Sequence, residues 1–566
     1  AIWYPVWDEG VHLDHSVRKP AEVLAAAEGD LRVALGLLDA RLVWGEPRVA
    51  GPLIDQAISL WRSKLGEKWL PRLSAQMTER HQSQGDLAFL LEPDLKEAHG
   101  GLRDANVLRA VAVYAPRFAD YVDLGSIEPT ASTLTAIRVE LHRRAGRALD
   151  KLLLQEQDQI ASILSYVDAD DLMSAVSRTG RVIAWAVDDA WRSQPSWQPA
   201  REQRFARRRP RPPTPARPSE VEPGVQLVGH EVALTDDADI GGDSSLPLRL
   251  AAVAAQRDLP IAKSALRRLA DRMPPAPDPW PLETREALVR ILLNGRAAIP
   301  ALESLDQEDL LSRFLPEWSE VRSRPQRNAY HRFTVDRHLL ETAAGAAALQ
   351  QRVDRPDLLV LGALLHDIGK GYPGDHTEVG IELVERIGPR MGLVRRDVEV
   401  LVAMVRHHLL LPDVATRRDL DDPVTIERVA GAVGDRRTLE LLGALAEADG
   451  LATGSSAWGS WKAGLVAELV QRTSAYLEGR PLPEGAAPVT ESQERLIEEV
   501  KRARRATVVL DPPQVTVAAA DRRGLLASVA GVLALHGLDV RRADATSKEG
   551  VAVEVFNVEV SRGSWP

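Results

Sequence analysis

The stretch from residue 338 to residue 449 most constrains how this chain can fold, because it places metal-ligating side chains inside a predominantly apolar, helix-patterned region. These side chains are His338, His366, Asp367, His376, His407, His408 and Asp449. Imidazole and carboxylate suit first-row divalent metals, and the adjacent pair His366-Asp367 can hold an ion from a single helix. His407 and His408 point about 100° apart on a helix, so each could serve a different ion. The pattern predicts an all-helical domain at residues 325–478 around two ions, Mg or Mn.

The chemistry expected of such a site is hydrolysis of a phosphate ester. In a two-metal site a bridging water is acidified and attacks phosphorus. We therefore expect His366 and Asp367 to be catalytic as well as ligating. Lys370 is a third catalytic candidate because its ammonium could meet a phosphate, although it could equally cap a helix C-terminus. The alternative for the histidines is a purely structural role, since a single buried histidine is usually a core residue.

The composition of the chain limits the kinds of protein to which it can belong. Its 566 residues are 45% hydrophobic, include no cysteine and carry a formal net charge of −10. Without cysteine there are no disulfides, thiolate nucleophiles or Cys-bound zinc, and the acidic balance argues against nucleic acid as a partner. No run approaches the ~18 apolar residues of a membrane span, and no secretory signal is visible, so we expect a cytoplasmic protein with no membrane partner. The chain opens on Ala1 rather than Met, so we expect that sequence precedes it.

Charged residues surround a Gly-Gly turn that follows a long helical stretch from about residue 54 to residue 81. The two motifs are Leu91-Glu92-Pro93-Asp94-Leu95-Lys96-Glu97 and Gly100-Gly101-Leu102-Arg103-Asp104. Glu92, Lys96, Arg103 and Asp104 could cradle phosphates at such a turn. They could equally form a surface ion-pair network, and the residues alone leave both interpretations open.

The remaining segments alternate linkers with regular structure. Residues 195–246 hold a basic, proline-rich linker, densest at 201–218, and then short strands, whereas residues 247–324 form a helical connector. A linker helix at 479–505 precedes residues 506–566, where a strand, a helix and two more strands are expected. This β-α-β-β order, with Asp521, Gly524 and Leu525 at the first turn, resembles an ACT domain of ferredoxin-like topology. A last helix and strand are missing, so we expect an exposed sheet edge.

Together these motifs resemble the GlnD family of bifunctional uridylyltransferase/uridylyl-removing enzymes, and the His/Asp pattern resembles an HD phosphohydrolase domain. The resemblance also rests on Trp3-Tyr4-Pro5-Val6-Trp7-Asp8 and on the segment from Pro325 to His338. It implies a multidomain, mostly α-helical chain. Residues 1–194 would be the C-terminal part of a nucleotidyltransferase domain with its helical support, residues 325–478 an all-α HD domain, and residues 506–566 a partial α+β ACT domain.

The resemblance also implies activities and partners. A member of this family transfers UMP from Mg-UTP to a tyrosine of the PII signal protein, and its HD domain hydrolyses UMP from the modified protein. Glutamine would act as the effector at Asp521, Gly524 and Leu525, although Asp521 could instead be an ordinary helix N-cap. The Gly-rich motif and the Asp-x-Asp pair of the family's transferase are not found in residues 1–150. We therefore expect this chain to lack transferase activity and to retain the hydrolase.

Three alternatives stand beside this interpretation. A homologue that adenylylates and deadenylylates PII would share every motif. A guanosine tetraphosphate synthetase/hydrolase combines similar modules, but its HD module comes first, whereas the transferase-like segment precedes His338 here. A non-catalytic glutamine-sensing scaffold is the third alternative, and the full set of ligands argues against it.

Overall fold

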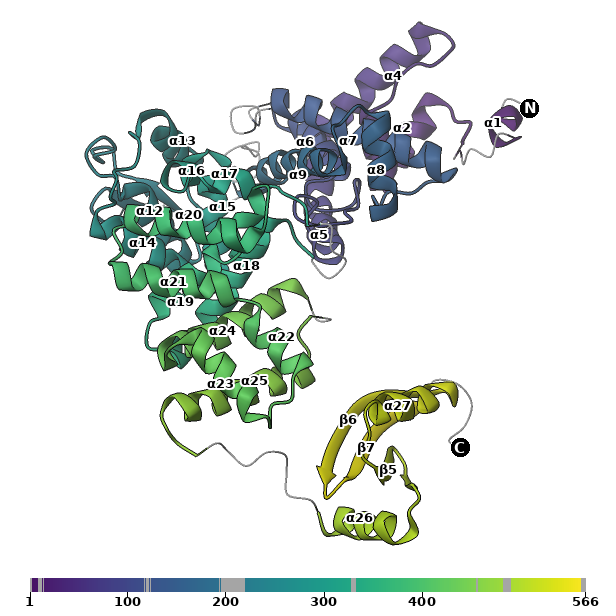
Figure 1. Cartoon of the computed structure of the whole chain (residues 1–566). Helices are drawn as coiled ribbons and strands as arrows, with labels where there is room; N and C mark the ends of the chain where they lie inside the picture. The colour runs from purple at the N-terminus through teal and green to yellow at the C-terminus, as the bar shows by residue number, and fades with distance from the viewer. Residues whose placement is uncertain are drawn as a thin grey trace, which may run out of the picture. The chain divides into compact units, whose positions relative to one another are not determined.

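The computed structural model describes residues 3–8, 13, 15–116, 118, 122, 124–192, 194, 219–326, 332–454, 457–481 and 490–560. Most of them lie in helices, as predicted, and the two small sheets are antiparallel (Figure 1). The chain forms two compact units, residues 1–408 with 447–457 and residues 409–446 with 458–566. The proline-rich segment 201–218 lies outside the described residues. None of the described helices has both the length and the hydropathy of a transmembrane span.

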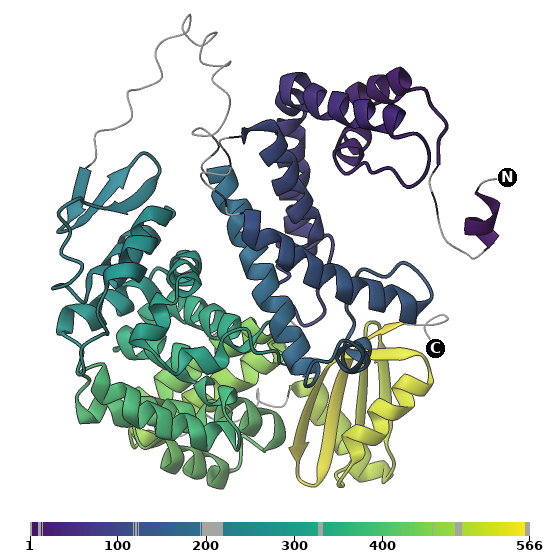
Figure 2. The same cartoon turned by 90° about the horizontal axis from the view of Figure 1, so that it is seen from above.

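The first unit begins with a helical body. Its helices are α1 (Tyr4–Asp8), α2 (Pro20–Gly29), α3 (Leu31–Leu38), α4 (Pro47–Leu60), the π-helical η1 (Trp61–Leu65), α5 (Gly66–Gln84), α6 (Leu102–Tyr114), α7 (Leu124–Ala145), α8 (Leu154–Ile163) and α9 (Ala169–Arg192). Helices α2 to α4 gather at one end of the longer helices (Figure 2). α9 is the central helix, because one stripe of it, with Leu172, Val176, Ile183 and Val187, is buried against α6, α7 and α8.

Residues 85–101, the motif loop, connect α5 to α6. Gly100 has φ +84°, and a Cβ there would lie 2.3 Å from the Gly180 carbonyl oxygen on α9, so only glycine fits. Nearer the N-terminal end of the loop, Leu90 forms a β-bridge with Phe333. The Thr334 N–H also donates to the Phe89 carbonyl at 3.0 Å. The motif loop therefore contacts both α9 and the residues that precede α18 (Val335–Ala348).

A small sheet and a group of helices follow the helical body. The strands β1 (Ser219–Glu222), β2 (Val225–Val228) and β3 (Glu231–Leu234) form a meander, close to where short strands were predicted. The predicted helical connector contains α12 (Leu246–Arg257), α13 (Lys263–Arg272), α14 (Leu282–Leu292), η3 (Gly295–Ala297), α15 (Ala298–Gln307), α16 (Leu310–Phe314) and α17 (Trp318–Val321). α12 packs against α14 and α15.

The predicted HD domain is helical throughout its described residues. In the first unit it contains α18, η4 (Gln350–Arg352), α19 (Pro356–Leu365), η5 (Ile368–Gly371), α20 (His376–Arg390) and α21 (Arg395–His407), and α24 (Arg436–Thr453) contributes its C-terminal part. Every residue of α19 from Leu358 to Leu365 is buried, because this helix is apolar on all sides. α19 contacts α14, α18 and α21 and forms the centre of the domain.

The second unit contains a helical group and an α/β module. In the helical group, α25 (Ser460–Leu477) packs against α22 (Leu410–Arg417) and α23 (Pro423–Val433). The module comprises α26 (Glu491–Ala503), β4 (Thr507–Asp511), β5 (Gln514–Ala520), α27 (Leu525–Leu535), β6 (Leu538–Lys548) and β7 (Val551–Val560). Its strand order is β4-β5-β7-β6, so the predicted β-α-β-β segment is present.

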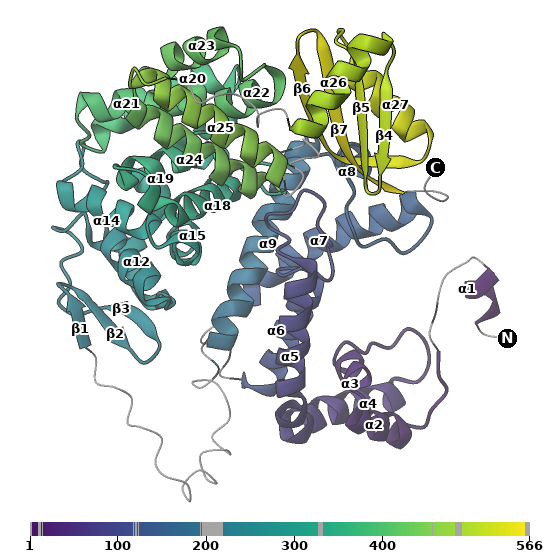
Figure 3. The same ribbon diagram turned by 90° about the horizontal axis from the view of Figure 1, so that it is seen from below.

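In the described residues the outer strands of this sheet are β6 and, beside the first predicted strand, β4, which was not predicted. This strand pairs along β5 from Thr507↔Ala518 to Asp511↔Gln514 and covers that edge. Ile497 and Val500 of α26 cover one face of the sheet, whereas α27 packs on the other (Figure 3). β4 was not predicted because its sequence does not alternate between apolar and polar residues: Val508, Val509 and Leu510 form a continuous apolar run, and all three are exposed. The assignment of this module to the ACT family stays a prediction.

A buried ion-pair network joins α9 to the helices around the predicted metal site. The Arg181 guanidinium donates to Asp306 Oδ2 on α15 at 2.7 Å and to Asp336 Oδ2 on α18. The side chain of Arg181 is 9% exposed, that of Asp306 4% and that of Asp336 1%. Arg181 also lies over the Phe89 ring of the motif loop, 4.9 Å from its centroid. The network fixes α18 against the helical body.

We predict that Arg181→Met lowers the free energy of unfolding of this unit by about 3–5 kcal/mol, because two buried carboxylates lose their cation. Hydrogen exchange of the α18 amides would measure the loss. Arg178→Met, one turn away on the exposed side of α9, should leave exchange unchanged. Equal protection in the two variants would contradict a stabilising role for Arg181.

Candidate metal centre

Five elements bring the candidate ligands together. α18 carries His338, the end of α19 leads into His366 and Asp367, α20 begins at His376, His408 follows α21, and α24 carries Asp449. The chain can turn sharply after Asp367 because Gly369 has no side chain: a Cβ there would lie 2.0 Å from the His376 carbonyl oxygen. This close approach sets α20 against the end of α19.

The inner group comprises His338, His366, Asp367 and Asp449. His338 Nε2 lies 3.0 Å from Asp449 Oδ1 and 3.8 Å from Asp367 Oδ2. His366 Nε2 lies 3.4 Å from Asp367 Oδ2 and 3.6 Å from Asp449 Oδ1. Two imidazoles and two carboxylates therefore converge within ligand distance of one small volume.

The outer group comprises Asp367, His376 and His408, and it uses the second oxygen of the same carboxylate. Asp367 Oδ1 lies 3.7 Å from His408 Nε2 and 3.9 Å from His376 Nε2. The side chain of His376 is 35% exposed, whereas that of His408 is 4% exposed. The outer group is therefore the side of the site that solvent and substrate can reach.

Backbone carbonyls orient two of the rings. His366 Nδ1 lies 2.9 Å from the Ala363 carbonyl oxygen, and His408 Nδ1 lies 2.7 Å from that of Val405. Since a carbonyl can only accept, each Nδ1–H donates, and Nε2 faces the carboxylates. This is the orientation that holds a metal-ligating histidine in place.

The donor set fits a divalent cation. Within the described residues, the buried atoms His366 Nε2 and Asp367 Oδ1 make no hydrogen bond. Buried polar atoms without a partner destabilise the folded state, and a bound ion would supply that partner. Burial opposes ionisation of Asp367, but His366 and Lys370 outweigh it and hold the pKa of this carboxyl well below its usual value. Burial likewise opposes protonation of His366, but Asp367 and Asp449 raise the pKa of that imidazole to about 10.

The structure does not bring His407 into either group, which corrects its predicted role as a ligand. His407 is the last residue of α21, and His408 rather than His407 faces Asp367. Burial, with Arg406 nearby, lowers the pKa of His407. The approximately 100° between successive helical residues points only one member of the doublet at the site.

Lys370 lies in the last turn of η5, and its side chain contacts the site. Its Nζ is 2.6 Å from Asp367 Oδ2 and donates to Gln326 Oε1 at 2.8 Å. Its side chain is 23% exposed, so the ammonium is accessible. Gln326 went unrecognised in the sequence because a single glutamine carries no metal or catalytic signal.

The four candidates for a phosphate cradle, Glu92, Lys96, Arg103 and Asp104, are each held by ion pairs or hydrogen bonds within the protein. Glu92 accepts from the Leu154 N–H at 2.9 Å and lines a cavity of about 520 Å³ with Lys151 and Arg332. Lys96 pairs with Asp150 at 3.3 Å, and Arg103 pairs with Glu97 at 2.6 Å. Asp104 is fully buried and accepts from the Gly100 N–H at 2.8 Å. The structure thus does not gather all four around one point.

A third His/Asp group lies beside the motif loop, formed by His81, His99 and Asp104. Both ring nitrogens of His99 are engaged, Nδ1 with Asp86 at 2.8 Å and Nε2 with Asp188 at 3.1 Å. Although burial opposes it, these two carboxylates raise the pKa of His99 to about 10. The group therefore acts as an ion-pair network that ties the loop to α9, and no local sequence pattern indicated it.

The histidine doublet gives a matched test of the outer group. We predict that His408→Ala weakens Mn binding by about 10-fold or more, because it removes a ligand, whereas His407→Ala leaves binding within about 2-fold. Titration calorimetry on the two variants would measure this. Equal losses would show that the doublet acts through packing rather than ligation.

The raised pKa of His366 predicts a pH dependence. A metal needs the neutral imidazole, so binding displaces a proton from His366, and affinity should rise about 10-fold per pH unit between about pH 6 and 8. Calorimetry in buffers of different ionisation enthalpy would count the released protons. An affinity that stays constant over this range would contradict a protonated His366 in the metal-free protein.

Comparisons with known proteins converge on one family. A model described as "HD domain" matches residues 335–454, and one described as "GlnD PII-uridylyltransferase" matches residues 70–188. The Bifunctional uridylyltransferase/uridylyl-removing enzyme of Streptomyces coelicolor is 45% identical over all of this chain and 74% of its own length. The enzymes of the same name from Mycobacterium tuberculosis and Rhodospirillum rubrum are 41% and 28% identical, over 70% and 68% of their lengths.

Proposed function

Because the chain belongs to the family of bifunctional uridylyltransferase/uridylyl-removing enzymes, we propose that its HD domain hydrolyses UMP from a uridylylated tyrosine of a PII protein. The observation that carries this proposal is the sharing of Asp367 between two groups of ligands. Such an arrangement suits cleavage of a phosphodiester between two divalent ions. His338, His366, Asp367 and Asp449 would hold one ion, and Asp367, His376 and His408 the other, with Mg or Mn as the candidates.

The chain's own residues have three tasks in this reaction. Bound ions would supply Lewis acidity toward a phosphoryl oxygen and lower the pKa of water. Asp367 would supply negative oxygen donors and the histidines neutral nitrogen donors, and His366 and Asp367 follow directly on the buried, apolar helix α19. Lys370 places an accessible ammonium beside Asp367, where it can meet the phosphate. Because a phenol of pKa about 10 is a good leaving group, no strong general acid is required.

The transferase half of the proposal rests on the family. The match to the PII-uridylyltransferase model covers residues 70–188, which is the part of the helical body from α5 to α9, and the family's reaction would use Mg-UTP. The described residues before Arg192 form helices and isolated bridges. In this view the body supports a nucleotidyltransferase domain, and the chain itself carries the hydrolase.

Glutamine is the proposed effector, acting at the α/β module. Gly524 adopts φ +83° immediately before α27, and Leu525 begins that helix. Asp521 does not cap α27; its Oδ2 accepts from Ser547 Oγ at 2.5 Å. The N-terminal end of α27 would suit the α-carboxylate of glutamine.

The decisive experiment incubates the chain with Mn and uridylylated PII, and separately with unmodified PII and labelled UTP. We expect UMP release in the first reaction and no label incorporation in the second. Adenylylated PII as a parallel substrate tests the alternative nucleotide, AMP. Absence of release with metal supplied would favour the scaffold.

A paired variant identifies the site responsible. We predict that Asp367→Asn lowers the rate of UMP release at least ~100-fold, because both groups of ligands lose a negative donor. Asp354→Asn changes an exposed carboxylate in the same domain and should retain the parental rate. Parental activity in Asp367→Asn would refute the assignment.

A further inference from the structure

The Lys370 ammonium lies between two oxygen atoms from different parts of the fold. Its Nζ is 2.6 Å from Asp367 Oδ2 and donates to Gln326 Oε1 at 2.8 Å. An ammonium has three N–H donors, so these two contacts leave one for a phosphate. Asp367 Oδ2 belongs to the inner group of ligands, where a bound ion would share its negative charge. The contact with Gln326 does not compete with an ion in this way.

The two neighbours of Gln326 fix the orientation of its amide. Its Nε2 donates to the Phe333 carbonyl at 3.3 Å, and a carbonyl can only accept. The Lys370 ammonium can only donate, so the side-chain oxygen of Gln326 must face it. Gln326 is 8% exposed, so water competes little for these bonds. A glutamate here would set an acceptor against the Phe333 carbonyl, and a methionine would offer no oxygen to Lys370.

The backbone before Gln326 is attached to η5, the turn that follows Asp367. Arg324 donates to the Gly371 carbonyl at 3.0 Å. A Cβ at Gly371 would lie 2.8 Å from the Cβ of Glu320, so the two segments approach closely. The Gln326 oxygen is therefore placed by contacts that lie outside both groups of metal ligands.

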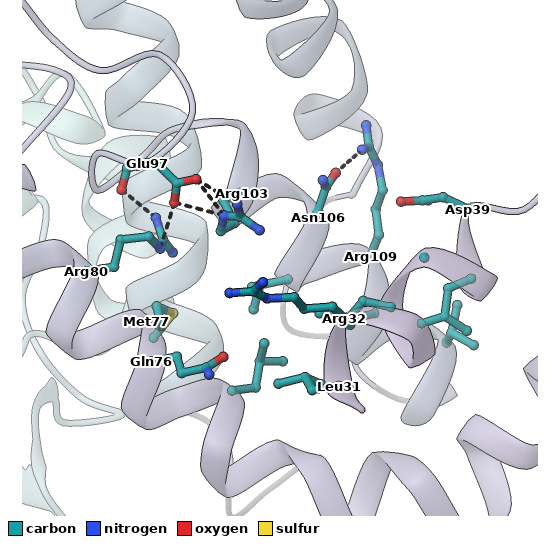
Figure 4. Close-up of a pocket in the computed structure, with 17 residues that line it drawn as sticks. Leu31, Arg32, Asp39, Gln76, Met77, Arg80, Glu97, Arg103, Asn106 and Arg109 are labelled. Atoms are coloured by element: carbon teal, nitrogen blue, oxygen red, sulfur yellow. Dashed lines mark hydrogen bonds and ion pairs between the residues drawn. The ribbon is translucent and has the colours of Figure 1, made fainter. Parts of the chain in front are cut away.

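The motif loop supports Gln326 from the other side. Gln326 and Leu90 of this loop line a cavity of about 10 Å³, a space for about one water molecule, so the side chain is closely packed. The loop is itself held at its far end, where Arg80 and Arg103 donate to Glu97 (Figure 4). Gln326 thus rests on a fixed part of the structure.

We propose that Gln326 is a positioning residue for phosphodiester cleavage at the metal centre. It holds the Lys370 ammonium beside Asp367 and leaves the third N–H for the phosphate of the substrate. Gln326 acts only through Lys370. This inference rests on the proposed function of the metal centre.

The kinetic test uses the whole chain with Mn, and uridylylated PII and bis(p-nitrophenyl) phosphate as separate substrates. Gln326→Met should lower kcat about 10-fold, as for the loss of one hydrogen bond to a charged group, and change KM less than ~3-fold. Gln326→Asn keeps the amide but is one carbon shorter, and it should show the same loss. Gln351→Met, at an exposed glutamine of the same domain, is the matched control.

A double variant separates positioning from a structural role. If Gln326 acts through Lys370, adding Gln326→Met to Lys370→Met should lower kcat no further. Mn affinity, measured by titration calorimetry, should stay within about 2-fold of the parent in Gln326→Met, because no ligand is removed. Multiplied losses in the double variant, or parental kcat in both Gln326 variants, would overturn the inference.

A measurement without metal or substrate tests the contact itself. In EDTA, Lys370 of Gln326→Met should be acylated by acetic anhydride at least ~3-fold faster than in the parent, because its amine loses a hydrogen-bond partner. Mass spectrometry of the digested protein would give this rate. An unchanged rate would refute the positioning of Lys370 by Gln326. A parent that cleaves neither substrate would instead refute the proposed function.

Discussion

The carboxylate of Asp367 is the group on which the candidate metal centre depends. It is 3% exposed and follows directly on a helix that is apolar on all sides. A buried carboxylate is stable only when cations and donors surround it, and the fold supplies His366, His408 and Lys370 for this purpose. The two Asp367 oxygens carry the buried negative charge that these groups balance, and the same two oxygens would each contact one of the two ions. Stability and metal binding therefore draw on one set of contacts.

Long-range packing places the other ligands around that carboxylate. His338 stands two residues after Asp336, and Asp336 is fixed by Arg181 from α9. Trp318 Nε1 and Arg322 also contact Asp306, the second carboxylate held by Arg181. A helix of the helical body thus holds α18, the helix that carries the candidate ligand His338.

Local patterns predicted the helical class, the short strands near residue 225 and seven candidate ligands, six of which lie together in the structure, because periodicity and ligand spacing are local properties. The failures have a common physical origin. Which member of the His407-His408 doublet faces the site depends on how α21 is rotated in its packing, and β4 pairs with β5 although the side chains of β4 are largely exposed. Arg181 and Asp336 are 155 residues apart in sequence, so no local pattern could indicate their contact.

The motif loop has a consequence for how variants of this protein are interpreted. Near its start, the Phe89 carbonyl accepts from the N–H of Thr334, the residue before α18. Near its end, Glu97 accepts from Arg80 and Arg103. A change anywhere in this short segment can shift both ends, because Gly100 pins the loop tightly against α9. A screen that scores only UMP release would assign such a variant to the metal centre, even where the altered contacts lie in the helical body. Residues of this loop contact both α9 and the segment before α18, so stability of the helical body and activity of the metal centre need to be measured on the same variant.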